Sequence, residues 1–126
     1  MPPDPKKHRS WPAKFGRAFR AIVLGVRGQS SFCIHGLAAV MVVAAGVPLK
    51  VSRAEWCLLV LCITIVLAAE MFNSSLERLA AAISDDYDHQ IHDALDMASA
   101  AVLIAAIGAV VVGAIVFLNR LVAIFG

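Results

Sequence analysis

The sequence predicts an all-α membrane protein with three transmembrane helices, preceded by an amphipathic helix that lies in the membrane interface. Two observations predict this class. The chain is 60% hydrophobic and only 16% charged, with a mean hydropathy of +0.81, so one small soluble core could not bury its apolar surface. The apolar residues also fall in long runs, and these runs are about as long as a helix needs to cross a bilayer.

The chain opens with a basic tail, residues 1–13, that we expect to be disordered. Pro2, Pro3 and Pro5, with a basic stretch from Lys6 to Arg9, leave it without a periodic apolar face. The first long apolar run that follows has about 20 residues, whereas the apolar part of a cleaved signal peptide has about 7 to 15. We therefore expect the N-terminus to be retained.

A surface helix is predicted over residues 14–28, within a single membrane domain of residues 14–126. Apolar residues recur there at helical spacing and basic residues occupy the other faces, as in a helix lying in the membrane interface. The apolar positions are Phe15, Ala18, Phe19, Ile22, Val23 and Val26. Arg17 and Arg20 have two interpretations, because they could hold the helix to the lipid surface or neutralise a bound phosphate.

Three charge-poor runs predict the transmembrane spans, at about 30–49, 55–72 and 97–118. The first and the third hold about 20 residues without Asp, Glu, Lys or Arg, which is enough to cross a hydrocarbon core of about 30 Å. The second run is shorter, and it crosses only if Glu70 lies at the membrane boundary.

Basic residues predict the orientation of these spans. The residues before the first span include Lys6, Lys7, Arg9, Lys14, Arg17, Arg20 and Arg27, whereas the loop after it offers only Lys50 and Arg53. The positive-inside rule therefore places the N-terminus in the cytoplasm. Residues 73–96 are then expected to form an acidic cytoplasmic loop.

The most informative residue is Glu70, because a carboxylate at the end of a membrane helix is costly and is read by default as functional. On a continuous helix Glu70, Asn73 and Glu77 share one face. His35, in the first span, is either a polar helix-packing residue or a headgroup contact. The sequence has no GxxxxGK[ST] loop, HExxH or GxSxG motif, so a site for phosphate chemistry would have to be built from helix faces.

Two runs of residues resemble a known family. They are Glu70-Met-Phe-Asn73-Ser74-Ser75-Leu76-Glu77 and, about twenty residues later, Asp96-Met97-Ala98-Ser99-Ala100-Ala101-Val102-Leu103. This pair resembles the small prokaryotic integral-membrane lipid kinases, the diacylglycerol kinase and undecaprenol kinase family. Further matches extend from Phe15 to about Leu121 and include Phe32-x-Ile34-His35, which is similar to the entrance of the family's first span.

The resemblance implies a homotrimer of three-span subunits that transfers the γ-phosphoryl group of ATP, with Mg²⁺ as cofactor, to a lipid hydroxyl. Glu70 matches the family's general base, and Asn73 matches an active-site polar residue. Glu77 matches a magnesium ligand, Asp96 a nucleotide contact, and Ser99 lies in the same nucleotide-binding motif. The implied partners are the lipid substrate, ATP and the membrane, with no nucleic acid.

Three positions depart from the family pattern. Gln29 stands where a second metal-binding Glu is usual, so a carbonyl ligand remains but its charge is lost. Leu95 replaces a usual phosphate-binding Lys, and Ala81 replaces an acidic residue. Arg17, Arg20 or Arg78 is then the candidate to supply the missing cation.

Diacylglycerol is the expected substrate, because the broader family is most often assigned that activity. Undecaprenol is the alternative, since His35 and the run Ser52-Arg53-Ala54-Glu55-Trp56 look more like the undecaprenol branch. A degenerate, non-catalytic member of the family is a second alternative, which the three substitutions favour. A small multidrug-type transporter would need four spans and a Glu in its first one, so that class is disfavoured.

Overall fold

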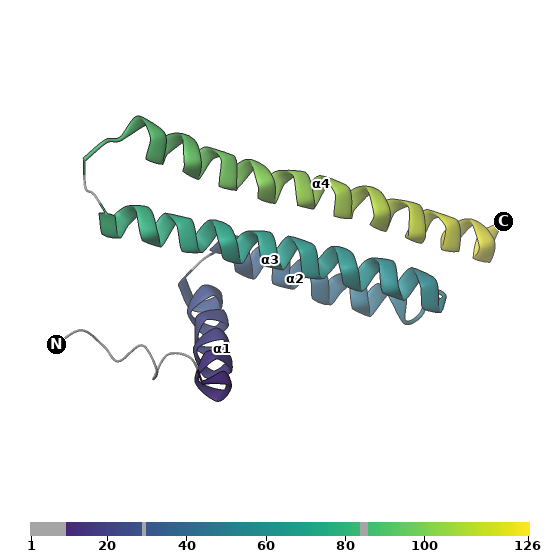
Figure 1. The fold of residues 1–126 in the computed structure, drawn as a ribbon. Coiled ribbons are helices and arrows are strands. Elements are labelled where there is room, and N and C mark those ends of the chain that lie inside the picture. Colours follow the sequence, from purple (N-terminus) through teal and green to yellow (C-terminus); the bar gives the residue numbers. More distant parts are fainter. Residues whose placement is uncertain (1–9, 29, 84–85) are drawn as a thin grey trace.

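The computed structural model describes residues 10–28, 30–83 and 86–126, and these residues form four helices and no strand (Figure 1). The helices are α1 (Trp11–Gly28), α2 (Ser30–Gly46), α3 (Arg53–Ile83) and α4 (His89–Phe125). α3 and α4 run antiparallel and side by side, and α2 packs along α3 (Figure 1). α1 lies at a steep angle to this layer, near the start of α2 (Figure 1).

Two of these helices are long and apolar enough to cross a membrane. α3 has 31 residues and α4 has 37, and at about 1.5 Å per residue both exceed a hydrocarbon core of about 30 Å. α2 has 17 residues and ends before the predicted boundary at residue 49. It ends there because Pro48 disfavours helical backbone at the residue before it, and because Lys50 has a φ of 54°. The third crossing therefore stays a prediction.

The prediction of a loop over residues 73–96 is wrong. α3 continues to Ile83 and α4 begins at His89, so only a short connection joins them. α3 continues because the residues after Asn73 include no Gly or Pro and are rich in Leu, Ala, Glu and Arg, which favour helix. Asp88 then caps α4, and its carboxylate accepts hydrogen bonds from two backbone N–H groups of the first turn, at 2.8 and 3.3 Å.

The surface helix begins earlier than predicted. α1 starts at Trp11 rather than at residue 14, with Pro12 in its first turn, where the missing N–H of a proline does no harm. The Lys14 ammonium lies 5.0 Å from the centre of the Trp11 ring, a cation–π contact that helps to hold this first turn. Of the predicted disordered tail, residues 1–9 lie outside the described part of the chain.

The end of the molecule at the α2–α3 turn, called here the turn end, is held by apolar packing. Val51, Leu59 and Val116 form a buried cluster there, and the Trp56 ring packs against it. The ring also lies against the backbone of Gly46. The turn end therefore joins α2, α3 and α4.

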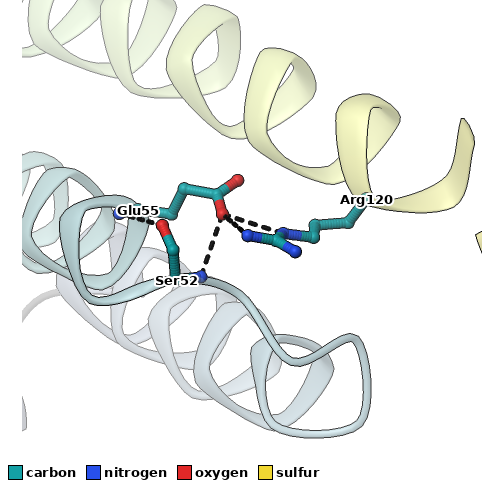
Figure 2. Close-up of polar contacts among 3 residues, drawn as sticks. All are labelled: Ser52, Glu55 and Arg120. Atoms are coloured by element: carbon teal, nitrogen blue, oxygen red, sulfur yellow. Dashed lines mark hydrogen bonds and ion pairs between the residues drawn. The ribbon is translucent and has the colours of Figure 1, made fainter. Parts of the chain in front are cut away.

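A polar network covers the same end (Figure 2). The Ser52 backbone N–H donates to Oε1 of Glu55 at 2.9 Å, and the Glu55 backbone N–H donates to Oγ of Ser52 at 3.2 Å. This reciprocal pair is a capping box that fixes the start of α3. The same Glu55 oxygen accepts from Nε of Arg120 at 2.8 Å and also contacts Nη2 of that guanidinium. The last turns of α4 are thereby tied to the first turn of α3.

Gly46→Ala is expected to destabilise the protein. A Cβ atom at Gly46 would lie 2.6 Å from Cη2 of Trp56, and the ring packs against the buried cluster, so it has little room to withdraw. Overpacking of this kind costs about 1–3 kcal/mol, which should lower the thermal unfolding midpoint in detergent.

Gly36→Ala is the matched control on the same helix. Nothing lies within 4 Å of a Cβ at Gly36, and Ala favours helix over Gly, so this variant should keep or raise the midpoint. Equal midpoints for the two variants would contradict the packing of Trp56 on Gly46.

Candidate active site

Glu70 is buried in the middle of α3, on the side that packs against the other helices. Its residue exposure is 2%, and its Oε1 lies 2.8 Å from Nδ1 of His35 on α2. A buried carboxylate is stable only when a polar or charged group faces it. His35 supplies that group, so the structure gives the histidine of the first apolar run a definite position against Glu70.

Two neighbours on α3 extend this polar face toward the α3–α4 connection. Asn73 donates a hydrogen bond from Nδ2 to Oε1 of Glu77 at 3.1 Å, as the predicted shared face requires. The other side of the amide, Oδ1 of Asn73, is buried and has no hydrogen-bond partner. Ser74 is 4% exposed, and its Oγ also has no partner. Among the residues whose burial is described, Glu70 and Ser74 are the two buried polar ones.

An apolar groove begins beside this polar cluster. It has a volume of about 370 Å³ and is lined by α2, α3 and α4, with His35 in its wall and Leu67, one turn before Glu70, beside it. Small residues of α4, among them Ala106 and Gly113, leave room for the groove, which extends as far as Phe117 near the turn end. It is a space shaped for hydrocarbon with a polar group at one end.

Asp96 and Ser99 lie on the exposed side of the first turns of α4. Asp96 Oδ2 is 3.6 Å from Nε2 of His92, one turn earlier. Glu77 lies about two turns before the end of α3, and Asp96 lies about two turns after the start of α4. Because the two helices are antiparallel, both carboxylates lie near the α3–α4 connection, called here the connection end. The two carboxylates therefore share a level along the helices, and Glu70 lies deeper.

The predicted phosphate-binding arginines, Arg17 and Arg20, lie on the exposed surface of α1. The same helix exposes Phe15 and Phe19, each at 69%, which suits a helix lying in a membrane interface. Gln29, the predicted second metal ligand, lies outside the described residues.

The donor set at this site fits a hard cation of the Mg²⁺ type. The carboxylate of Glu77 is an oxygen donor of the kind that holds Mg²⁺, which usually takes one or two carboxylates together with phosphate and water. Oδ1 of Asn73, on the preceding turn, is a second oxygen and has no partner, while Nδ2 of the same amide donates to Glu77. In residues 10–28, 30–83 and 86–126 no group of three or more His, Cys, Asp or Glu side chains converges to form an all-protein metal cage.

Three features of the structure had little or no signal in the sequence patterns. The contact between His35 and Glu70 joins two helices, so the pattern along either helix does not predict it. The sequence showed only that His35 is a polar residue inside an apolar run. Ser74 was signalled only by its four-residue spacing from Glu70, which Ser75 does not share. The ion pair between Arg120 and Glu55 holds the turn end together. In the sequence, Arg120 stood out only because it is the one basic residue after the last apolar run.

Long apolar helices and a buried carboxylate define a helical membrane protein with a polar site inside it. The family model for prokaryotic diacylglycerol kinase matches residues 16–117. The chain belongs to this family, whose members are lipid kinases, and the family identified from the two sequence runs is confirmed. No individually curated protein gives a significant match to the chain.

Proposed function

We propose that the protein transfers the γ-phosphoryl group of ATP, with Mg²⁺, to the hydroxyl of diacylglycerol at the cytoplasmic face of the inner membrane, and that it does so as a homotrimer. The single observation that carries this proposal is the position of Glu70. Its carboxylate is buried, has His35 as a partner at 2.8 Å, and lies beside one end of an apolar groove. A lipid alcohol requires this combination, because its tail needs an apolar surface and its hydroxyl needs a proton acceptor.

Glu70 is the general base in this reaction. Its carboxylate accepts the proton of the lipid hydroxyl as the lipid oxygen attacks the γ-phosphorus, a new P–O bond forms, and the bond from phosphorus to the leaving oxygen of ADP breaks. His35 is proposed to act on Glu70 rather than on the substrate, since its Nδ1 lies 2.8 Å from Oε1 of that carboxylate. The other oxygen, Oε2, is the one proposed to accept the proton of the lipid hydroxyl.

The nucleotide is proposed to bind at the connection end of the helices. Glu77, with Gln29 as the predicted second ligand, would hold Mg²⁺, which would neutralise charge on the phosphates. Asn73 would position the Glu77 carboxylate through the hydrogen bond that its Nδ2 donates to Oε1 at 3.1 Å. Asp96 and Ser99 lie at the same end on α4 and are proposed to contact the nucleotide. Because Leu95 removes the usual lysine, an exposed arginine of α1, such as Arg17 or Arg20, is the cation expected near the phosphates.

Two alternatives have specific support. Undecaprenol, which carries one hydroxyl on a long hydrocarbon chain, would also suit an apolar groove that ends beside Glu70. A non-catalytic family member is favoured by the substitutions at Gln29, Leu95 and Ala81, although it leaves a buried carboxylate without a role.

Purified protein in mixed micelles with radiolabelled ATP tests the proposal. We expect label to appear in phosphatidic acid when the micelles contain diacylglycerol. Label in undecaprenyl phosphate alone would assign the other substrate, and no labelled lipid from either micelle would leave the non-catalytic member. Sedimentation of the same sample in detergent should give the mass of a trimer, and a monomer mass would remove the homotrimer from the proposal.

The proposed orientation predicts which positions can be labelled from outside the cell. In a background whose three native cysteines are replaced by alanine, cysteines at Ser10 and Tyr87, both exposed, should resist an impermeant thiol reagent. A cysteine at Gly126 should react, because three crossings leave the C-terminus outside. Labelling at Ser10 or Tyr87 in intact cells would contradict the orientation, and with it access to cytoplasmic ATP.

A further inference from the structure

Two adjacent serines of α3 differ in how their hydroxyls are used. Ser75 is exposed, and its Oγ donates to the backbone carbonyl of Phe72 at 2.8 Å, the usual way in which a helical serine satisfies its hydroxyl. Ser74 is buried, at 4% exposure, and its Oγ has no partner. A buried hydroxyl without a hydrogen bond lowers stability, so its presence one turn from Glu70 points to a role in binding.

Ser74 lies at the position along α3 where the transferred phosphoryl group is expected. Along α3 the groove residues Val66 and Leu67 come first, then Glu70, then Ser74, and then Glu77 one turn further. Ser74 is about 6 Å beyond Glu70 along the helix axis and on the same face. It therefore stands between the proposed proton acceptor and the proposed metal ligand, where the phosphoryl group must pass from nucleotide to lipid.

We propose that the Ser74 hydroxyl binds the phosphoryl group, donating a hydrogen bond from Oγ to one of its oxygens. This rests on the proposed function and adds a neutral donor to a site in which Leu95 leaves the usual lysine position without a charge. The ligand chemistry is a phosphoryl oxygen, which is present on the γ-phosphate of the nucleotide and on the phosphate of the lipid product. A donor fixed by burial is aimed before the reaction begins, which is the condition for stabilising negative charge on a reacting group.

The test compares Ser74→Ala with Ser75→Ala, its matched control on the next residue. Ser74→Ala should lower kcat by about tenfold to a hundredfold, the range for a hydrogen bond to a charged group, while its thermal midpoint stays equal or rises because an unpartnered buried hydroxyl is removed. Ser75→Ala should keep kcat. Loss of kcat together with a lower midpoint in Ser74→Ala would indicate a structural serine and overturn the proposal.

A binding measurement separates this inference from the proposed function. The thermal midpoint of the wild-type protein should be higher in micelles with phosphatidic acid than in micelles with diacylglycerol, and Ser74→Ala should lose most of this difference while Ser75→Ala keeps it. The same midpoints measured with and without a non-hydrolysable ATP analogue show whether Ser74 also binds the phosphate of the nucleotide. If both variants respond like the wild type to both ligands, Ser74 does not bind phosphate. If no lipid is phosphorylated but the midpoint difference depends on Ser74, the kinase activity fails and the phosphate site remains.

Discussion

Glu70→Gln is expected to reduce lipid phosphorylation by about 10²- to 10⁴-fold, the usual contribution of a positioned general base. Glutamine keeps the shape of the side chain and can still face Nδ1 of His35, which lies 2.8 Å from the native carboxylate. It cannot accept a proton from a lipid hydroxyl. The rate constant for transfer from radiolabelled ATP to diacylglycerol in mixed micelles measures the effect.

A second measurement shows whether the loss is chemical. The Michaelis constant for ATP should change little in Glu70→Gln, because the nucleotide is proposed to bind at the connection end, nearer to Glu77. The thermal midpoint should change little, since glutamine keeps the volume of the side chain and a polar group that faces His35. Turnover near that of the wild type would make Glu70 a structural carboxylate and would leave the proposed reaction without a base.

Glu77→Gln is expected to raise the Mg²⁺ concentration for half-maximal activity by about tenfold to a hundredfold. The variant exchanges a charged oxygen ligand for an amide, and a hard cation binds carboxylate more strongly; the size follows from the loss of one interaction with a charged group. Nδ2 of Asn73, which donates to the Glu77 carboxylate at 3.1 Å, would then donate to an uncharged amide oxygen. Activity as a function of free Mg²⁺ at saturating ATP measures the shift.

Gln29→Glu is the complementary change at the same proposed ion. Restoring a carboxylate there should lower the Mg²⁺ requirement, and in the double variant the two effects should not add, because groups that share one ligand are coupled. Strict additivity, or no shift from either change, would mean that the two side chains do not share a metal ion.

Much of the fold could be predicted because it depends on local composition. The charge-free runs anticipate the apolar middle parts of α3 and α4, and the spacing of Phe15, Phe19 and Ile22 anticipates α1. The end of α3 could not be obtained in the same way. Hydropathy falls at Glu70, whereas the helix continues to Ile83 because helix formation depends on backbone preference and capping, not on solubility in lipid.

The candidate site was predictable along one helix and not between helices. Glu70, Asn73 and Glu77 share a face because a helix has a fixed period, and the bond from Asn73 to Glu77 follows from it. The partner of Glu70 is 35 positions away in sequence, and the partner of Glu55 is 65 positions away. Such pairs depend on how helices pack, which periodicity along one helix does not determine.

The groove beside Glu70 lies among helices that run side by side, and α2 and α4 both pack on α3. A ligand bound there would be exchanged sideways with the bilayer, so neither the lipid alcohol nor its phosphorylated product would need to enter water. The search for substrate is then a two-dimensional one. The quantity that sets the rate becomes the surface density of the lipid in the membrane, its mole fraction among the surrounding lipids, rather than its concentration in the whole volume.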